Sequence, residues 1–334
     1  MRKRLCELFF IILAGLVLFE IVGQTVVFRH KLYFVNDVDH RMEPHSRIDI
    51  NGDGIRSLFE ADHFRPEDHN ILFLGDSYVY GYDLEYSEAP PQRLEAMARE
   101  YFPGRTIHVA NFGWISSSPL LSLRLLRDIG ERYQPDVVLF GLDMSDFEDD
   151  PKYTLLLERR GAYRSLHAMP ITFLAVKRMF RKIGPLHGLH ETFFHYPAKR
   201  FFVTDGPKED HLPYYGIVRN NIDAMAEYSR DVLGAEFVLF LFPRNYQYSD
   251  RESPRNWEGR HYENLGPYAH EPFEYFESIR HELDYPVYSL LPDFQRTDAF
   301  PTCFERDPHW TPLGAEVAAQ AVFRYCVEAG CFGG

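Results

Sequence analysis

The sequence has few cysteines and no surplus of basic residues, and each shortage excludes a class of protein. Only four cysteines occur in 334 residues, and none has the C-x-x-C spacing of a zinc or thiol redox site. Lysine and arginine total 36 against 49 aspartates and glutamates, which gives a formal net charge of −13. Because nucleic-acid binding needs a basic face, this balance argues against a nucleic-acid partner. The sequence also contains no internal repeat and no low-complexity tract.

Three of the four cysteines lie near the C-terminus, at Cys303, Cys326 and Cys331. A disulfide from Cys303 to either of the other two would suit an oxidising compartment, and it would leave one thiol over. Cys6 lies in the N-terminal segment and lacks the small residues that precede a lipidated cysteine. The cysteines therefore leave the redox compartment open.

The one long apolar run lies at the N-terminus. It follows the basic residues at 2–4 and continues to Phe28. About 20 apolar residues behind a basic start are typical of a transmembrane helix whose N-terminus is cytoplasmic. A cleaved signal peptide is the alternative, but no clean small-x-small cleavage site follows the run. We therefore predict a membrane anchor over residues 1–30, with the catalytic domain periplasmic or extracellular.

A polar, turn-rich connector over residues 31–70 contains a calcium-loop pattern, D-x-[DN]-x-[DN]-G-x5-E. Two features speak against calcium: Arg56 occupies the usual aliphatic position, and no second loop exists to pair with this one. The alternative is a surface turn that leads into the next domain. The residues of the pattern are Asp49, Asn51, Asp53, Gly54 and Glu60.

From residue 71 to about 330, short apolar runs alternate with helical patterns. Such alternation predicts a parallel sheet with helices on both faces. An insertion at about 151–216 interrupts the pattern with a basic amphipathic stretch, which is either a membrane-lying helix, a lid or a solvated helix. His187, His190 and His195 lie in this insertion without a matching acidic set, so we predict no metal site. The expected strands are 71–75, 106–110, 135–146, 236–242 and 285–290, and the expected helices are 91–101, 119–133, 219–233, 271–283 and 312–327.

Two motifs carry candidate chemistry. G-D-S-Y-V-Y-G follows the first strand, and in open α/β sheets ligands bind beyond the carboxyl ends of such strands. Ser77 is therefore either a nucleophile or an ordinary helix N-cap. D-P-H-W-T-P-L-G precedes the last helix, and a histidine beside a carboxylate is what a serine nucleophile needs. Together the motifs favour His309 as base and Asp307 as its partner.

These motifs resemble those of the SGNH (GDSL-like) hydrolases. G-D-S at residues 75–77, Gly113 after the second strand, a polar residue after the third, and D-P-H-W occur in the order of the four family blocks. The resemblance covers about residues 51–327 without the insertion, and it is closest to a membrane-anchored bacterial branch with a similar N-G-R connector. It implies a three-layer, flavodoxin-like α/β fold with Ser77 as nucleophile, His309 as base and Asp307 as its orienting partner.

The resemblance also implies an oxyanion hole built from Ser77, Gly113 and Ser145. Ser145 departs from the family, because an asparagine is expected there. The leading hypothesis is a membrane-anchored extracytoplasmic serine esterase, a deacylase or acyltransferase that acts on acetyl groups of envelope or exported carbohydrate and needs no cofactor. The rival hypothesis is a non-catalytic glycan-binding or assembly protein on a hydrolase scaffold.

Overall fold

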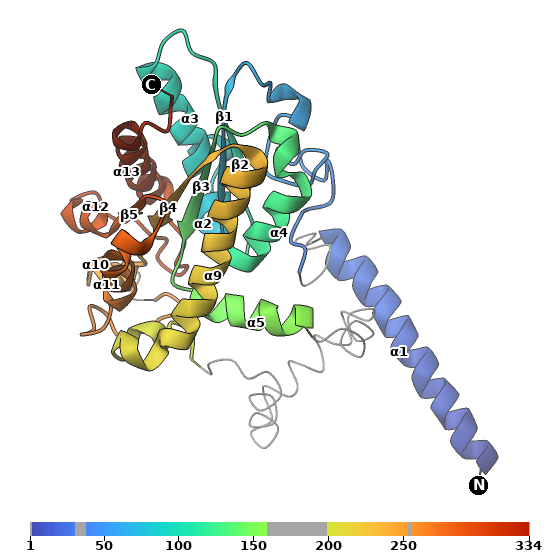
Figure 1. The fold of residues 1–334 in the computed structure, drawn as a ribbon. Coiled ribbons are helices and arrows are strands. Elements are labelled where there is room, and N and C mark those ends of the chain that lie inside the picture. Colours follow the sequence, from blue (N-terminus) through green and yellow to red (C-terminus); the bar gives the residue numbers. More distant parts are fainter. Residues whose placement is uncertain (1, 31–37, 159–198, 253–254, 334) are drawn as a thin grey trace.

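A five-stranded parallel sheet forms the centre of the protein, as the sequence predicts. The structure is a computed structural model that describes residues 2–30, 38–158, 199–252 and 255–333. The strand order β2-β1-β3-β4-β5 is that of flavodoxin-like doubly wound sheets (Figure 1). The strands are β1 (His69–Gly75), β2 (Ile107–Gly113), β3 (Val137–Leu142), β4 (Glu236–Leu241) and β5 (Val287–Ser289).

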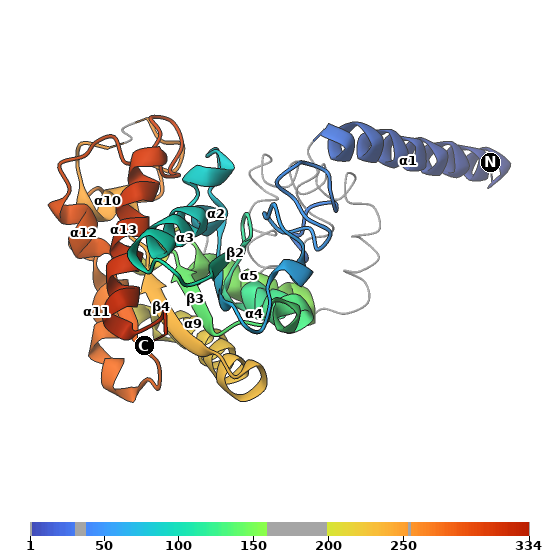
Figure 2. The same cartoon turned by 90° about the horizontal axis from the view of Figure 1, so that it is seen from above.

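Helices cover both faces of this sheet and complete the predicted three layers. The pair α3 (Pro90–Tyr101) and α13 (Pro312–Ala329) packs together on one face (Figure 2). On the other face α9 (Leu212–Tyr228) contacts both α4 (Pro119–Ile129) and α5 (Asp146–Glu158). The shorter helices are α2 (Ser77–Tyr80), α10 (Asn245–Tyr248), α11 (Glu271–Ser278) and α12 (Leu291–Arg296).

Burial on both faces explains why the strands are almost continuously apolar. Every residue of β2 and β3 is buried, and so are the last six of β1. The predicted boundaries shift at strands and at helices. The strand expected at 135–146 ends at Leu142, and Asp146 already begins α5. The helix expected at 119–133 ends at Ile129 and continues as a 3-10 turn, Gly130–Tyr133. β2 is longer than expected because it also includes Asn111 and Gly113.

The N-terminal helix α1 spans Arg2–His30. The apolar side chains of residues 8–13 and 16–19 are largely exposed. Across the described ranges, no helix combines the length and the apolarity that crossing a membrane requires. The predicted transmembrane helix is therefore not confirmed.

Two described helices border the predicted insertion at about 151–216. At its start, α5 continues through Pro151 to Glu158, and at its end α9 begins at Leu212. Two 3-10 turns, Phe202–Thr204 and Lys208–His211, precede α9. The basic amphipathic stretch at 172–184 and the three histidines of the insertion lie outside the described residues.

The disulfide from Cys303 that the sequence leaves open is not formed, because Cys303, Cys326 and Cys331 are all free, buried thiols. Cys303 pairs in a β-bridge with Trp310, just before α13, whereas Cys326 lies in the last turns of that helix. At 1.5 Å per residue, roughly 20 Å of helix separates the two cysteines. A disulfide needs Cα atoms within about 7 Å, so this spacing excludes the bond.

Candidate active site

Ser77 lies at the carboxyl ends of the strands, where β1 leads directly into the single-turn helix α2. Asp76 caps this helix, because its carboxylate accepts a hydrogen bond of 2.9 Å from the Tyr78 N–H. Gly81 ends the helix in the left-handed conformation, with φ 77°. Ser77 is thus the first helical residue and not the cap that the alternative interpretation expected.

The structure brings Ser77, His309 and Asp307 together in one hydrogen-bonded chain. Ser77 Oγ lies 2.7 Å from His309 Nε2, and His309 Nδ1 contacts Asp307 Oδ1. The His309 backbone N–H donates to the same carboxylate oxygen at 3.0 Å, which fixes the spacing of the two residues. A hydroxyl, an imidazole and a carboxylate in this order are able to pass a proton from the serine to the histidine.

The Asp307 carboxyl is held in its ionised form. Burial alone would raise its pKa, but hydrogen bonds from His309 and Trp257 and the charge of His309 lower the pKa below the usual aspartate value. An ionised Asp307 accepts the Nδ1 proton of His309, so that Nε2 is left to accept a proton from Ser77.

Two of the three predicted oxyanion donors already have protein acceptors. The Gly113 N–H donates to Asn111 Oδ1 at 3.0 Å. Ser145 donates twice to Asp143, from its N–H at 2.8 Å and from its hydroxyl at 2.5 Å. Ser77 contributes the first N–H of α2, and such N–H groups have no partner within their own helix.

Gly113 is nevertheless required at its position, for a packing reason. A Cβ atom there would lie 2.2 Å from the Tyr80 backbone nitrogen, so any side chain would push α2 away from β2. Beyond Gly113, Ser116 adopts the left-handed conformation with φ 57°, which non-glycine residues rarely adopt. Gly113 and Ser116 therefore together set the path of the loop after β2, which runs beside the Ser77 helix.

A buried ion network behind Ser145 was missed in the sequence. Arg244 follows β4 and donates to both carboxylate oxygens of Asp143, at 2.8 and 2.7 Å, and it also pairs with Glu258. The three side chains are at most 3% exposed. The Arg244 charge and hydrogen bonds lower the pKa of Asp143 although burial opposes this. A charged residue three positions after the end of β4 was the available signal for Arg244.

Tyr78 links the serine helix to the histidine loop. Its hydroxyl donates to the Pro308 carbonyl at 2.7 Å, and Pro308 stands between Asp307 and His309. The Arg244 guanidinium lies 5.3 Å from the centre of the Tyr78 ring. The residue after the serine therefore holds the other end of the hydrogen-bonded chain in place.

The residues of the calcium pattern have other partners in the structure. Asp49 pairs with Arg47 at 2.8 Å and with Arg56 at 3.0 Å, while Glu60 accepts the Gly52 N–H. Asp53 pairs with Arg132 and accepts from Tyr133, and the Asn51 amide donates to the Phe59 carbonyl and to Tyr133. Within the described ranges, no three potential ligand side chains gather as a metal site would need. These contacts fit a structural turn, but one that is largely buried and not on the surface, since Asp49 and Asn51 are at most 5% exposed.

The connector instead braces the serine helix through Arg56. Its guanidinium is 2% exposed and donates to the carbonyls of Tyr80, Gly81 and Leu84 at 2.7–2.9 Å. These carbonyls belong to the end of α2 and the loop after it. Sequence reasoning placed Arg56 in the connector motif but did not find this role.

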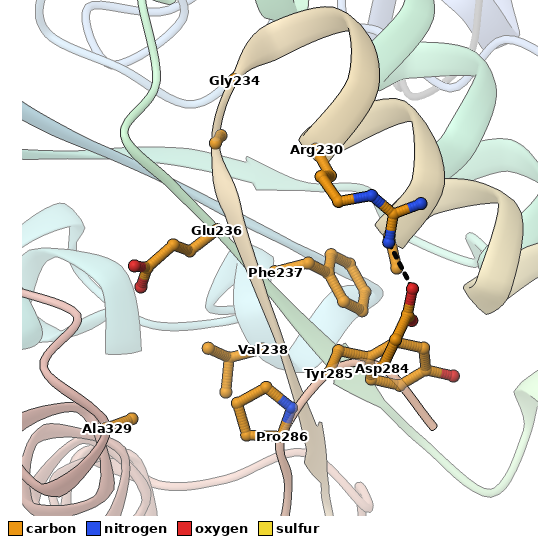
Figure 3. Close-up of a pocket in the computed structure, with 11 residues that line it drawn as sticks. Arg230, Gly234, Glu236, Phe237, Val238, Asp284, Tyr285, Pro286 and Ala329 are labelled. Atoms are coloured by element: carbon orange, nitrogen blue, oxygen red, sulfur yellow. Dashed lines mark hydrogen bonds and ion pairs between the residues drawn. The ribbon is translucent and has the colours of Figure 1, made fainter. Parts of the chain in front are cut away.

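Three hollows lined by described residues lie away from Ser77. A hollow of about 340 Å³ opens at the amino ends of β4 and β5, between Phe237, Tyr285 and an ion pair of Arg230 with Asp284 (Figure 3). Because all strands are parallel, this hollow lies at the amino ends of the strands, whereas Ser77 lies at their carboxyl ends. Two further hollows, near Trp114 and near Leu157, also lack the predicted site residues.

No family model matches this chain, and no curated relative matches it. Among solved structures it is similar to TesA, at 12% identity, a TM-score of 0.45, and coverage of 77% of this chain and 98% of that one. It is also similar to a carbohydrate acetylesterase family member from Sinorhizobium meliloti (11%, TM-score 0.45, coverage 79% and 99%). A third is the esterase EstA from Pseudoalteromonas sp. (17%, TM-score 0.39, coverage 78% and 100%). Likenesses at this level carry no argument about chemistry, which rests on the site itself.

Proposed function

We propose that the chain is a serine esterase of the SGNH (GDSL-like) type. The observation that carries the proposal is the 2.7 Å contact between Ser77 Oγ and His309 Nε2, with Asp307 on the other imidazole nitrogen. A serine hydroxyl is a weak nucleophile until a neighbouring base accepts its proton. This arrangement supplies that base, and it does so at the carboxyl ends of the strands, where α/β enzymes bind their substrates.

The proposed reaction has two halves. In the first, Ser77 Oγ attacks the ester carbonyl, His309 takes the serine proton and then delivers it to the leaving alcohol, and an acyl-Ser77 ester forms. In the second, water or another alcohol gives its proton to His309 and attacks the acyl group, the bond from the acyl carbon to Ser77 Oγ breaks, and His309 returns the proton to Ser77 Oγ. Hydrolysis and acyl transfer differ only in this second acceptor.

The transition-state oxyanion needs hydrogen-bond donors. The Ser77 N–H is the donor best supported by the geometry, since Gly113 and Ser145 would each have to exchange an existing acceptor. Each oxyanion donor is typically worth about 100- to 1,000-fold in turnover. With one free oxyanion donor among the three predicted ones, we expect either a slow enzyme or one whose substrate rearranges the Ser145 loop.

We further propose that the substrates are acetylated carbohydrates outside the cytoplasm and that α1 attaches the enzyme to a membrane. The exposed apolar side chains of α1, such as Phe9 and Phe10, and the basic residues at 2–4 support the attachment. Cell fractionation tests it: the full chain is expected with membranes, and release from them by high salt alone would contradict the proposal.

Hydrolysis of p-nitrophenyl acetate tests the esterase. Wild-type protein is expected to release p-nitrophenol, and Ser77→Ala is expected to lower the rate by at least about 10⁴-fold. The exposed Ser87, in the 3-10 turn Tyr86–Glu88 that follows the serine helix, provides the matched control Ser87→Ala with unchanged rate. Equal rates for wild type and Ser77→Ala would contradict the proposal.

A non-catalytic glycan-binding protein is the second candidate. The observation that favours it is the Ser145 hydroxyl, which is bound to Asp143 where the family carries an oxyanion-hole amide. Glycan binding with the same affinity in wild type and Ser77→Ala, without turnover of any acetyl ester, would favour this candidate over the esterase.

A further inference from the structure

Two buried cysteines, Cys326 and Cys331, lie together at the end of α13. Gly330 ends this helix in the left-handed conformation, with φ 77°, and the chain turns back so that the Cys331 N–H donates to the Cys326 carbonyl at 2.9 Å. The Gly330 N–H donates to the Val327 carbonyl at 3.3 Å. These two bonds define a Schellman cap, in which the residue after the glycine commonly packs on the helix residue that its N–H reaches.

The pair satisfies the distance condition that Cys303 and Cys326 fail. Covalent bonds and the 2.9 Å hydrogen bond join the Cα atoms of Cys326 and Cys331 by a bent path, so the two atoms are no more than about 7 Å apart. A disulfide needs Cα atoms within this limit. The thiols are also neighbours: burial and the hydrogen bond between the two sulfurs raise the pKa of the Cys326 thiol.

The segment that carries Cys331 is fastened to the amino ends of the sheet. His69, the first residue of β1, donates from Nε2 to the Cys331 carbonyl at 2.7 Å. Arg105, just before β2, donates to the carbonyls of Phe332 and Gly333. Both cysteines of the pair are 0% exposed. Because the fold already holds the two sulfurs together in a dry space, a bond between them needs little rearrangement.

We propose that Cys326 and Cys331 are a disulfide-forming pair that staples segment 330–333 to α13 when the protein meets a disulfide oxidant. In the first step, the thiolate of one cysteine attacks a low-molecular-weight or protein disulfide, forms a mixed disulfide and releases one thiol. In the second, the other cysteine attacks the cysteine sulfur of the mixed disulfide and releases the second thiol. The oxidant thus gains the two electrons and two protons that the pair loses. Ser77 takes no part, so the proposal is independent of the esterase.

The buried position determines when the bond forms. A thiol without exposed surface does not meet an oxidant in the closed structure, so exchange requires that segment 330–333 opens or that the chain is still folding. Once formed, the bond closes a short loop and restricts the unfolded chain. Roughly 20 Å of α13 separates the pair from the His309 loop. The expected effect is therefore on stability and not on the reactive groups.

Peptide mapping after redox equilibration tests the bond. Full-length protein is unfolded and refolded in detergent with reduced and oxidised glutathione, treated with N-ethylmaleimide in denaturant and digested with trypsin. Both cysteines of the pair fall in one peptide, 325–334, whereas Cys303 falls in 297–306. Peptide 325–334 is expected to lack two hydrogen atoms and carry no maleimide, while the equally buried Cys303 is expected to carry one. Two maleimides or a glutathione adduct on peptide 325–334 would overturn the proposal.

The redox equilibrium separates a staple favoured by the fold from a bond that any two nearby cysteines form. The folded chain is expected to keep the disulfide against a glutathione buffer at least about tenfold more reducing than the chain in guanidinium chloride tolerates. The same mapping of peptide 325–334 measures both equilibria. Equal values for the folded and unfolded chain would overturn the proposal.

Differential scanning calorimetry measures the effect of the staple on stability. Oxidised wild-type protein is expected to melt about 3–6 °C above the reduced protein. Cys331→Ala is expected to abolish this difference, and the matched control Cys303→Ala, which removes another buried thiol, is expected to keep it. Each variant is compared with itself in two redox states, so the cost of the substitution does not enter. No difference in wild-type protein, or an equal difference in Cys331→Ala, would overturn the staple.

Discussion

The turn at residues 75–81 and the turn at residues 49–54 each match a short functional pattern, but they fold into different chemical surroundings. In the first, the Ser77 hydroxyl meets an imidazole at 2.7 Å, and the carboxylate behind that imidazole is still partly exposed. In the second, Asp49 is bound by two arginines. A pattern of oxygen ligands becomes a metal site only if the fold leaves those oxygens without other partners.

Arg56 connects the two turns. It neutralises Asp49 in one turn and binds three carbonyl oxygens at the end of the serine helix in the other. The connector therefore supports the nucleophile and is not an independent site. Variants at each turn are expected to have different consequences: loss of activity at the first and loss of stability at the second.

The largest effect is expected from Asp307→Asn. An amide at this position no longer stabilises a protonated His309 and favours the wrong imidazole tautomer, which lowers turnover by about 10⁴-fold. The p-nitrophenyl acetate assay checks the rate, and circular dichroism checks that the fold is retained. A folded variant with more than a tenth of the wild-type rate would show that Asp307 is not the partner of His309.

Arg56→Ala is expected to lower the free energy of unfolding by about 3–5 kcal/mol, because it leaves three carbonyls without their donor and the buried Asp49 carboxylate with Arg47 alone. Denaturant titration measures this change. Arg47→Ala is the matched control, since Arg47 binds the same carboxylate from an exposed position and should cost less than about 1 kcal/mol. Equal losses in the two variants would contradict the bracing role.

The buried Asp150 carboxyl, which is bound by Leu120 and Asn221 and not by an arginine, should make stability depend on pH. Burial, opposed by hydrogen bonds from Leu120, Ser118 and Asn221, raises the pKa of Asp150 to about 7. Between about pH 4 and 7 the folded state keeps this proton and the unfolded state loses it, so stability falls as pH rises, by up to about 1.4 kcal/mol per pH unit. The decline should end above pH 7.

Asp150→Asn removes this titration. The difference in unfolding free energy between wild type and the variant should therefore change between pH 4 and 7 and stay constant above pH 7. Denaturant titrations across this range measure it. A difference that is constant at every pH would show that Asp150 is ionised in the folded state.

Ser145→Ala should have a modest effect on activity. The Ser145 hydroxyl is bound to Asp143, so its loss should cost about 1–2 kcal/mol of stability and less than about tenfold in turnover. An oxyanion donor would cost about 100- to 1,000-fold. Steady-state kinetics distinguish the two, and a loss in the larger range would restore Ser145 to the oxyanion hole.

The smallest effect is expected from calcium. Because the oxygens of the 49–60 pattern already have partners, millimolar calcium or a chelator should leave the melting temperature unchanged. Differential scanning calorimetry of the full chain measures this. A rise of several degrees with calcium and its reversal by the chelator would show that the loop binds the ion.

The sequence was sufficient for the sheet, because buried parallel strands are uninterrupted apolar runs and the helices between them carry clear caps, such as Thr311 before Pro312. The position of Ser77 followed from the end of β1, and that of His309 from the motif just before the start of α13. The contacts of Arg56 and Arg244 could not be read in this way. Each reaches carbonyls or carboxylates on strands and loops 7 to 101 positions away in the chain, and only the folded chain brings these together.

The most direct test of the account is labelling with a fluorophosphonate, which reacts only with a serine activated by a neighbouring base. Intact-mass and peptide analysis of the full chain are expected to find one adduct, on Ser77, that disappears in Ser77→Ala and is strongly reduced in Asp307→Asn. Absence of an adduct on the folded wild-type protein, or an adduct on another serine, would contradict the assignment of Ser77 as the nucleophile.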